Sequence, residues 1–171
     1  MRKVVTEALT LEPQTVEHAV EMFEVLGDPA IYTYENEPPA SLEWLRARFE
    51  KLESRRSKDG REQWLNWVVR LPSSELIGYV QASVRDDGSA AIAYVLSGAW
   101  WGQGLACHAV TAMMNELAGQ YGVTFFTAVA KRENFRSTRL LERLGFATAD
   151  ERLLAKLQIE PDEVLMCRGA A

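Results

Sequence analysis

The sequence predicts a single α/β domain, built on a mixed and mostly antiparallel sheet of about six to seven strands with helices on both faces. Three observations support this fold class. A chain of 171 residues, 47% of them hydrophobic, is long enough for one substantial core. Three strand-like runs between residues 64 and 98 are joined by short turns, which indicates an antiparallel meander. A glycine turn and a helix then separate two apolar runs, which is typical of a right-handed crossover between parallel strands.

The N-terminal part of the chain carries first a strand pattern and then a helix pattern. Residues 3–11 contain β-branched side chains in rough alternation and predict a first strand. Residues 15–26 place apolar side chains on one helical face, which predicts the first helix. Thr15 is a suitable N-cap for it, and His18 stands where a capping box usually has an acid.

The middle of the chain begins with an expected loop. Residues 31–40 are aromatic, acidic and rich in proline, so we expect them to lie outside the core. A second helix is predicted over residues 41–60, where charges alternate in sign until a glycine ends the pattern. The three strands of the meander are expected at residues 64–71, 75–84 and 90–98.

The C-terminal half repeats a strand and helix order. A helix is predicted from residue 103 to about residue 119, followed by a buried-type strand over residues 123–130. A short helix is expected within residues 133–146, and two closing runs, near residues 146–155 and 163–169, complete the chain. The strands on either side of the 103–119 helix should be parallel neighbours.

Charge and composition argue against several classes of function. A formal net charge of −5 and an isoelectric point of about 5.2 argue against generic nucleic-acid binding through a basic surface. The two cysteines, Cys107 and Cys167, form no CxxC pair, and the two histidines form no cluster, so we expect neither a metal site nor a disulfide framework. No apolar run is long enough to cross a bilayer, so we expect a cytoplasmic protein without membrane contact.

The stretch WWGQGLACHAV places two glycines, Gly102 and Gly104, at the start of a predicted helix. Glycine costs roughly 1 kcal/mol relative to alanine inside a helix, so the pair indicates either close packing or positive φ angles. Unpaired N–H groups at such a junction can bind phosphate oxygens. A dinucleotide fingerprint is excluded because Cys107 replaces its third glycine, and a P-loop is excluded because the chain contains no Gly-Lys pair. A phosphate-binding turn and a simple packing turn both remain open here.

The same stretch, followed by KRENFRSTRLLERLGF at residues 131–146, resembles the acetyl-CoA site of the GNAT acetyltransferase superfamily. It is similar to the branch that contains the ribosomal-protein N-terminal acetyltransferases and their small-molecule relatives, the RimJ/RimL-like enzymes. Members of this branch commonly carry WG-x-G-x-A at the helix start, then N-x-x-S and L-E-K-x-G-F. The resemblance implies one N-acetyltransferase domain over residues 1–171, in which the parallel strand pair splays apart to admit acetyl-CoA.

The resemblance also implies roles for individual residues. Those expected to bind acetyl-CoA are Tyr94, Val95, Leu96, Trp101, Gly102, Gln103, Gly104, Leu105, Ala106, Asn134 and Ser137. Three of them, Tyr94 to Leu96, would bind the pantetheine arm through their backbone, and one of these N–H groups would polarise the thioester carbonyl. The turn from Gln103 to Ala106 would bind the diphosphate. Trp101 has a second interpretation as an aromatic cover for the core, and Asn134 as a helix N-cap.

Two departures from the family pattern leave the catalytic groups open. Many members have a tyrosine acid four residues after Ser137, where this chain has Leu141, so Ser137 or water is the candidate acid. Relatives often carry a glutamate where Ala91 and Ala93 stand here. Carboxylates of the 31–40 loop, Glu35 and Glu37, are then the candidate bases, although each also reads as a solvated loop acid.

The predicted function is therefore transfer of an acetyl group from acetyl-CoA to a primary amine, by direct attack in a ternary complex. The acceptor is either a protein N-terminus or a small-molecule amine such as a polyamine or an aminoglycoside. Nothing in the sequence resembles a supported Ser or Cys nucleophile, so no covalent enzyme intermediate is expected. A homodimer is left open. The alternative is a catalytically silent CoA-binding or regulatory module.

Overall fold

The protein, described here by a computed structural model, is built on one open sheet. The structure describes residues 1–34, 36–155, 157 and 159–170. In these residues the strand order is β1-β2-β3-β4-β5-β6-β8-β7. The strands are β1 (Val4–Val5), β2 (Thr10–Pro13), β3 (Glu62–Arg70), β4 (Leu76–Arg85), β5 (Ser89–Leu96), β6 (Phe125–Lys131), β7 (Ala147–Thr148) and β8 (Glu163–Gly169). The predicted α/β class and mixed sheet are confirmed, with eight strands in place of the six to seven expected.

The higher strand count comes from the two ends of the chain. The single strand predicted over residues 3–11 is a hairpin of β1 and β2, closed by Thr6, whose N–H and hydroxyl both donate to the carbonyl of Leu9. The closing run at 146–155 forms only the two-residue strand β7 before the chain turns into a short helix. The Asp150 carboxylate caps that helix by accepting the N–H of Leu153 at 2.9 Å, which ends the strand.

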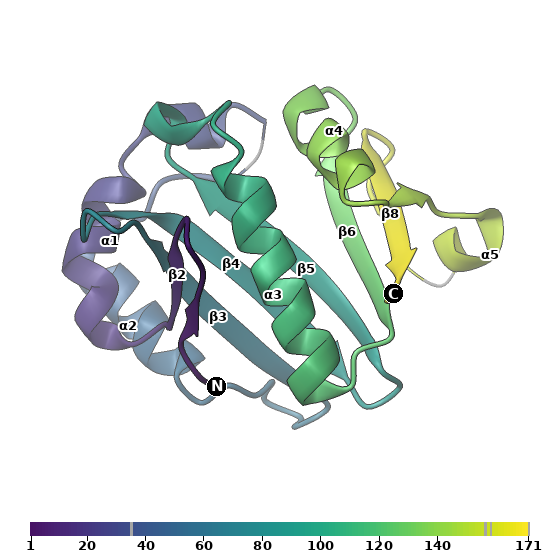
Figure 1. Cartoon of the computed structure of the whole chain (residues 1–171), viewed down its shortest axis with the longest axis horizontal. Helices are drawn as coiled ribbons and strands as arrows, with labels where there is room; N and C mark the ends of the chain where they lie inside the picture. Colours follow the sequence, from purple (N-terminus) through teal and green to yellow (C-terminus); the bar gives the residue numbers. More distant parts are fainter. Residues whose placement is uncertain (35, 156, 158, 171) are drawn as a thin grey trace.

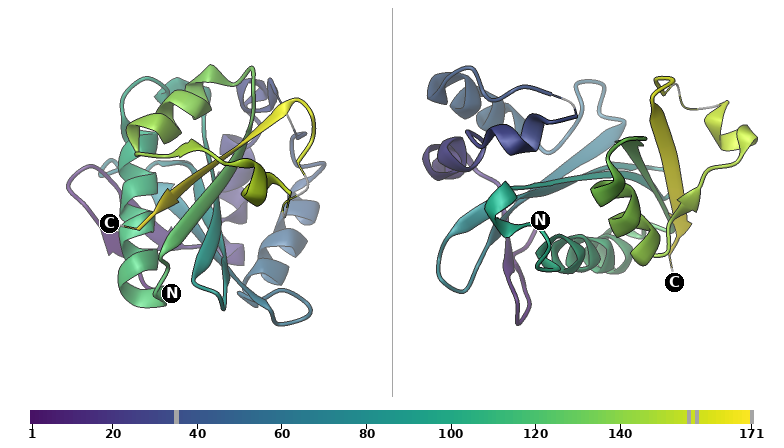
Figure 2. Two further views of the ribbon diagram at one scale, coloured as in Figure 1. Left: turned by 90° about the vertical axis from the view of Figure 1, so that its right-hand side faces the viewer. Right: turned by 90° about the horizontal axis from the view of Figure 1, so that it is seen from above.

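Helices cover both faces of the sheet, as predicted (Figure 2). α1 and α2 lie on one face, whereas α3 and α4 lie on the other. The helices and 3-10 turns are η1 (Val16–His18), α1 (Ala19–Val25), η2 (Pro29–Tyr32), α2 (Leu42–Leu52), η3 (Gly98–Trp100), α3 (Leu105–Tyr121), α4 (Phe135–Arg143) and α5 (Glu151–Leu154). The second helix was predicted to continue to residue 60, but it ends at Leu52, the last apolar residue of its stripe. None of the helices in the described residues has the length and hydrophobicity of a membrane span.

The sheet separates two hydrophobic cores. Trp67 and Val68 are adjacent in β3 and both have no exposed surface, yet they belong to different cores because successive strand residues point to opposite faces. Trp67 packs in the core under α3 and α4, together with Met113 and Leu141. Val68 packs in the smaller core under α1 and α2, together with Phe49. Both helical layers are therefore fixed to the same central strands.

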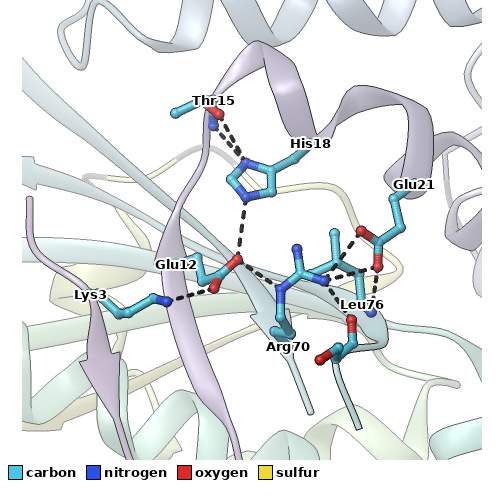
Figure 3. A network of polar contacts seen from close by, with 8 residues as sticks. Lys3, Glu12, Thr15, His18, Glu21, Arg70 and Leu76 are labelled. Atoms are coloured by element: carbon cyan, nitrogen blue, oxygen red, sulfur yellow. Dashed lines mark hydrogen bonds and ion pairs between the residues drawn. The ribbon is translucent and has the colours of Figure 1, made fainter. Parts of the chain in front are cut away.

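A polar network fixes α1 to the sheet (Figure 3). The Glu12 carboxylate of β2 accepts Lys3 Nζ at 2.9 Å and Arg70 Nε at 2.9 Å. Arg70 also donates through Nη1 to Glu21 of α1, at 3.1 Å. His18 bonds the backbone N–H of Thr15 through Nδ1 at 3.1 Å, which confirms the predicted capping position. Although burial alone would raise it, the hydrogen bonds and charges of Lys3 and Arg70 lower the pKa of Glu12 to about 2.

Candidate active site

The two parallel strands β5 and β6 separate along their length. Their register pairs in the described chain are Ser89 with Phe125, Ala90 with Phe126 and Ala91 with Thr127. Both strands then continue for several residues without a further pair, as far as Leu96 and Lys131. Figure 1 shows them meeting near the bottom of the view and diverging toward the top, where α4 and the start of α3 lie. The predicted splay is thus present, and its open end faces the glycine turn.

The backbone of β5 directs alternate peptide groups into this splay. Ser97 donates its N–H to the carbonyl of Ile77 at 2.9 Å, and so points toward β4. An added Cβ on Gly78 of β4 would lie 2.0 Å from the Val95 carbonyl oxygen, so the Val95 carbonyl also faces β4. In a strand the N–H and C=O of one residue point to the same side, and those of the next residue point to the opposite side. The N–H and C=O of Tyr94 and Leu96 therefore face the splay. Their N–H groups are therefore directed toward the opening between the two strands.

The glycine turn requires positive φ angles and does not serve as a packing contact between strand and helix. Gly102 and Gly104 have φ angles of +77° and +78°, a region that disfavours other residues. An added Cβ at either position would find no atom within 4 Å, so neither glycine is required to let the strand and helix pack. Gly104 is the N-cap of α3, has no side-chain cap, and the first turn carries no acidic residue. The turn therefore presents main-chain donors at the positive end of a 17-residue helix.

Trp101 combines the two interpretations that the sequence left open. Its indole Nε1 donates to the Leu96 carbonyl at 2.8 Å, and its ring packs against the larger core. The same side chain lines the cavity at the splay, where the Arg136 guanidinium lies 3.8 Å above the ring centroid. Arg136 is exposed on α4 and brings a positive charge close to the glycine turn. The sequence motif did not single out this arginine.

Asn134 and Ser137 lie together at the start of α4, opposite Tyr94. The Asn134 carboxamide oxygen accepts the Ser137 N–H at 3.1 Å, so Asn134 is the N-cap and also lines the cavity. The Tyr94 hydroxyl is 2.8 Å from Ser137 Oγ and 3.3 Å from the Ser137 carbonyl oxygen. Burial raises the pKa of Tyr94 to about 12. Leu141, at the position of the family tyrosine, is 1% exposed within the core.

One cavity of about 760 Å³ contains most of the predicted site. The predicted cofactor residues on its wall are Tyr94, Val95, Leu96, Trp101, Ala106, Asn134 and Ser137. The remaining turn residues, Gly102, Gln103, Gly104 and Leu105, lie beside this wall, and the first three are exposed. Gln103 also donates through Nε2 to the Ala99 carbonyl at 3.3 Å. The chain thus brings its β5, turn and α4 residues to one place.

The opposite part of the cavity wall comes from the loop after η2 and from α2. Glu37 lines it with an exposed side chain, whereas Glu35 lies outside the described residues. Tyr32 also lines it, and its hydroxyl donates to the Leu26 carbonyl at 2.7 Å. Across the sheet floor, the wall continues over Ala91 and Ala93 of β5. The structure therefore leaves Glu37 as the predicted base candidate that borders the described cavity.

The charges around the cavity are mixed in sign. Its charged lining residues in the described chain are Arg48, Arg85, Arg136, Glu37 and Glu163. Two of them already have partners, because Arg85 donates to Glu62 at 2.9 Å and Glu163 binds Lys131 at 3.1 Å. Among the described lining residues, arginines therefore outnumber glutamates by three to two.

The sequence analysis did not predict two features of the candidate site. The Asp28 carboxylate accepts the N–H of Gly98 at 2.6 Å and of Ala30 at 2.9 Å, which joins the loop bordering the cavity to the turn before the glycines. These backbone hydrogen bonds hold the pKa of Asp28 below its ordinary value. Gln14 lines the cavity, is 7% exposed, and its Nε2 has no hydrogen-bond partner among the described residues. No motif marks Gln14, and none marks Asp28, whose partner Gly98 lies 70 positions away in the sequence.

A comparison with protein families identifies the family of this chain. The profile of the acetyltransferase (GNAT) domain matches residues 8–147, which span the splay, the glycine turn and the whole of α4. The chain belongs to the GNAT acetyltransferase family. It is an N-acetyltransferase, and the resemblance inferred from the WG-x-G-x-A and N-x-x-S motifs is confirmed. A comparison with curated proteins returns no match.

Solved structures of GNAT proteins share this fold over the whole chain. RimL, a ribosomal L7/L12 alpha-N-protein acetyltransferase in complex with coenzyme A, superposes with a TM-score of 0.79 at 16% identity, covering 98% of each chain. A ribosomal-protein-S5-alanine acetyltransferase from Vibrio fischeri gives 0.77 at 19% identity, covering 99% of this chain and 97% of the other. An acetyltransferase from Thermus thermophilus gives 0.72 at 22% identity, with 99% and 100% coverage. At these identities the likeness establishes the GNAT fold.

Proposed function

We propose that this GNAT protein transfers the acetyl group of acetyl-CoA to the α-amino group of a polypeptide, by direct attack in a ternary complex. The observation that carries the proposal is one continuous cavity of about 760 Å³. It reaches from Trp101 and Asn134 beside the glycine turn to Glu37 and Trp44 on the opposite wall. Both substrates can therefore meet within it.

The donor end of the cavity suits acetyl-CoA. The open space at Gly102 and Gly104 allows a diphosphate to approach the main-chain donors from Gln103 to Ala106 without meeting a Cβ. Arg136 adds a positive charge at the same place. The pantetheine arm would extend along the unpaired part of β5 and bond its outward peptide groups as another strand does.

The chemistry requires little beyond positioning. The neutral amine attacks the thioester carbonyl, whose oxygen accepts the N–H of Tyr94 or Leu96 as negative charge develops there. The new C–N bond forms, the C–S bond breaks with its electron pair passing to sulfur, and the ammonium proton leaves to Glu37 or water. In this proposal, Ser137 donates a hydrogen bond to the departing thiolate. Correct placement of two reactants alone contributes roughly 7–11 kcal/mol to such a reaction.

The cavity charges favour a peptide over a polyamine or an aminoglycoside. A polycationic acceptor requires a surplus of carboxylates, whereas the described lining carries three arginines and two glutamates. The buried Nε2 of Gln14 is a free donor suited to a carbonyl oxygen, which a peptide has and a polyamine lacks. RimL and the Vibrio fischeri protein, named for acetylation of ribosomal proteins, share the fold and support a protein acceptor.

Calorimetry and a thiol-release assay test this proposal together. Acetyl-CoA is titrated into the protein, and CoA release is then measured with peptides of varied N-terminal residue, with spermidine and with an aminoglycoside. We expect saturable binding of acetyl-CoA and release that is fastest with a peptide. The same peptides with a blocked α-amine and a free lysine are the matched control, and should give no release.

Two results would contradict it. Binding of acetyl-CoA without release for any amine supports the alternative, a catalytically silent CoA-binding module. Faster release with spermidine or the aminoglycoside than with every peptide overturns the choice of acceptor while leaving the acetyltransferase activity in place.

A further inference from the structure

A hydroxyl pair crosses the splay at the point where the site needs a hydrogen-bond donor. The phenol of Tyr94, on β5, lies 2.8 Å from Ser137 Oγ, on α4. Both side chains line the cavity, and the two elements are otherwise separated by the divergence of β5 and β6. The tyrosine that many GNAT relatives carry on α4 is replaced here by the buried Leu141. A phenol is therefore present at this end of α4, but it comes from strand β5 and not from the helix itself.

The position of Ser137 is fixed from two sides. Its backbone N–H donates to the Asn134 side chain at 3.1 Å, which holds it in the first turn of α4. Its hydroxyl has one hydrogen to donate and can accept two hydrogen bonds. The Tyr94 hydroxyl is nearer to Ser137 Oγ, at 2.8 Å, than to the Ser137 carbonyl oxygen, at 3.3 Å. When the phenol donates to Oγ, the single hydrogen of Ser137 is left for another acceptor.

We propose that Tyr94 is a positioning residue for the acetyl transfer: its phenol donates to Ser137 Oγ and so directs the Ser137 hydroxyl hydrogen toward the sulfur of the departing CoA. This inference rests on the proposed function. Burial keeps the phenol protonated, since the pKa of Tyr94 is raised to about 12. Tyr94 therefore remains a donor throughout the ordinary range of pH.

The role is hydrogen-bond donation and not proton transfer. As the C–S bond breaks, its electron pair passes to sulfur, and the Ser137 O–H stabilises the resulting thiolate. The Tyr94 phenol stays bonded to Oγ, where it strengthens the donor power of the serine, because hydrogen bonds in a chain polarise one another. The thiolate leaves as the anion or takes its proton from water. No atom of the Tyr94 side chain needs to reach the substrate.

The test compares Tyr94→Phe, Ser137→Ala and the double variant with two acyl donors. The first donor is acetyl-CoA, and the second is the same molecule with selenium in place of the thioester sulfur. A selenolate is a far better leaving group and gains little from a hydrogen bond. Tyr121→Phe is the matched control, since Tyr121 ends α3 outside the cavity lining. Steady-state rates are measured with one peptide acceptor that the wild-type chain uses.

We expect Tyr94→Phe to lower kcat with acetyl-CoA about tenfold, as for one hydrogen bond lost in the transition state, with KM for acetyl-CoA unchanged. The loss should fall below twofold with the selenium donor. The double variant should be no slower than Ser137→Ala alone, because Tyr94 acts through Ser137. Tyr121→Phe should leave both rates unchanged.

The two proposals fail in different ways. An active wild-type chain in which Tyr94→Phe loses the same factor with both donors, or in which the losses of the two single variants multiply, overturns the role of Tyr94 alone. An unchanged kcat in Tyr94→Phe would also overturn the role of Tyr94 alone. A wild-type chain that binds acetyl-CoA but acetylates no amine overturns the proposed function, and this inference with it.

Discussion

Replacing Gly104 by alanine separates a binding role of the glycine turn from a structural one. Gly104 is the N-cap of α3 with a φ of +78°, and Gly122 is the C-cap of the same helix with a φ of +66°. An added Cβ meets no atom within 4 Å at either position. Gly122→Ala is therefore a matched control, because it introduces the same backbone strain at the other end of the same helix.

The expected effect on stability is the same for both variants. A left-handed conformation costs a non-glycine residue about 1–2 kcal/mol. The surroundings add no steric cost at either position, because the new Cβ meets no atom. For a chain of 171 residues this corresponds to a decrease in Tm of about 2–8 °C. Differential scanning calorimetry of the two variants and the wild-type chain checks this equality.

The expected effect on acetyl-CoA binding differs. At Gly104 the new methyl group lies where the diphosphate would approach the main-chain donors, and it would cost one charge-assisted hydrogen bond of about 1.5–3 kcal/mol. The Kd should therefore rise about 10- to 150-fold in Gly104→Ala and stay within about twofold of wild type in Gly122→Ala. Titration calorimetry with acetyl-CoA measures both. Equal affinities in the two variants would falsify the assignment of the turn to the diphosphate.

Three further predictions concern the sheet and the acceptor side. In Gly78→Ala the new Cβ would lie 2.0 Å from the Val95 carbonyl oxygen, so β5 must shift, and we expect a stability loss above about 2 kcal/mol in urea titrations together with a loss of acetyl transfer. The pKa of Glu12 is lowered to about 2 in the folded chain, so its stabilising effect is present above pH 4.5 and disappears toward pH 2. Glu12→Gln should therefore destabilise by about 1–2 kcal/mol at pH 7, after allowance for solvent screening, and match wild type near pH 2. Gln14→Met removes the unpartnered donor, and kinetics should show KM for a peptide raised about tenfold with KM for acetyl-CoA unchanged.

Local patterns predicted the central part of the fold well. Strands β3, β4 and β5 alternate in burial or are joined by short turns, and such signals depend only on neighbouring residues. The glycine-bounded helix α3 and the strand after it follow from the same kind of local evidence. The second helix was predicted too long because charges that alternate in sign continue after its apolar residues end at Leu52. Charged residues tolerate a helix, but only the apolar stripe fixes its end.

In the candidate site, too, residues marked by a local motif could be predicted, whereas their partners from distant segments could not. The turn from Trp101 to Ala106 and the pair Asn134 and Ser137 could be predicted, because their spacing within short segments is a motif in itself. The partners of these residues could not. Asp28 meets the Gly98 turn across 70 positions, and Tyr94 meets Ser137 across 43. Such pairs depend on how the sheet twists and splays, which no local pattern records.

The missing glutamate of β5 bears on the choice of acceptor. Ala91 and Ala93 line the cavity where relatives often place a carboxylate, so this chain has no base on the strand beside the splay. An amine must lose its proton before it attacks, and a lysine or polyamine nitrogen with a pKa near 10.4 is almost wholly protonated at neutral pH. A peptide α-amine has a pKa of about 7.7–8.0, so roughly a tenth or more of it is already neutral at pH 7. The lack of a carboxylate on β5 is thus far less costly for an N-terminal amine than for a polyamine, and this agrees with the described charges of the cavity, where arginines outnumber glutamates.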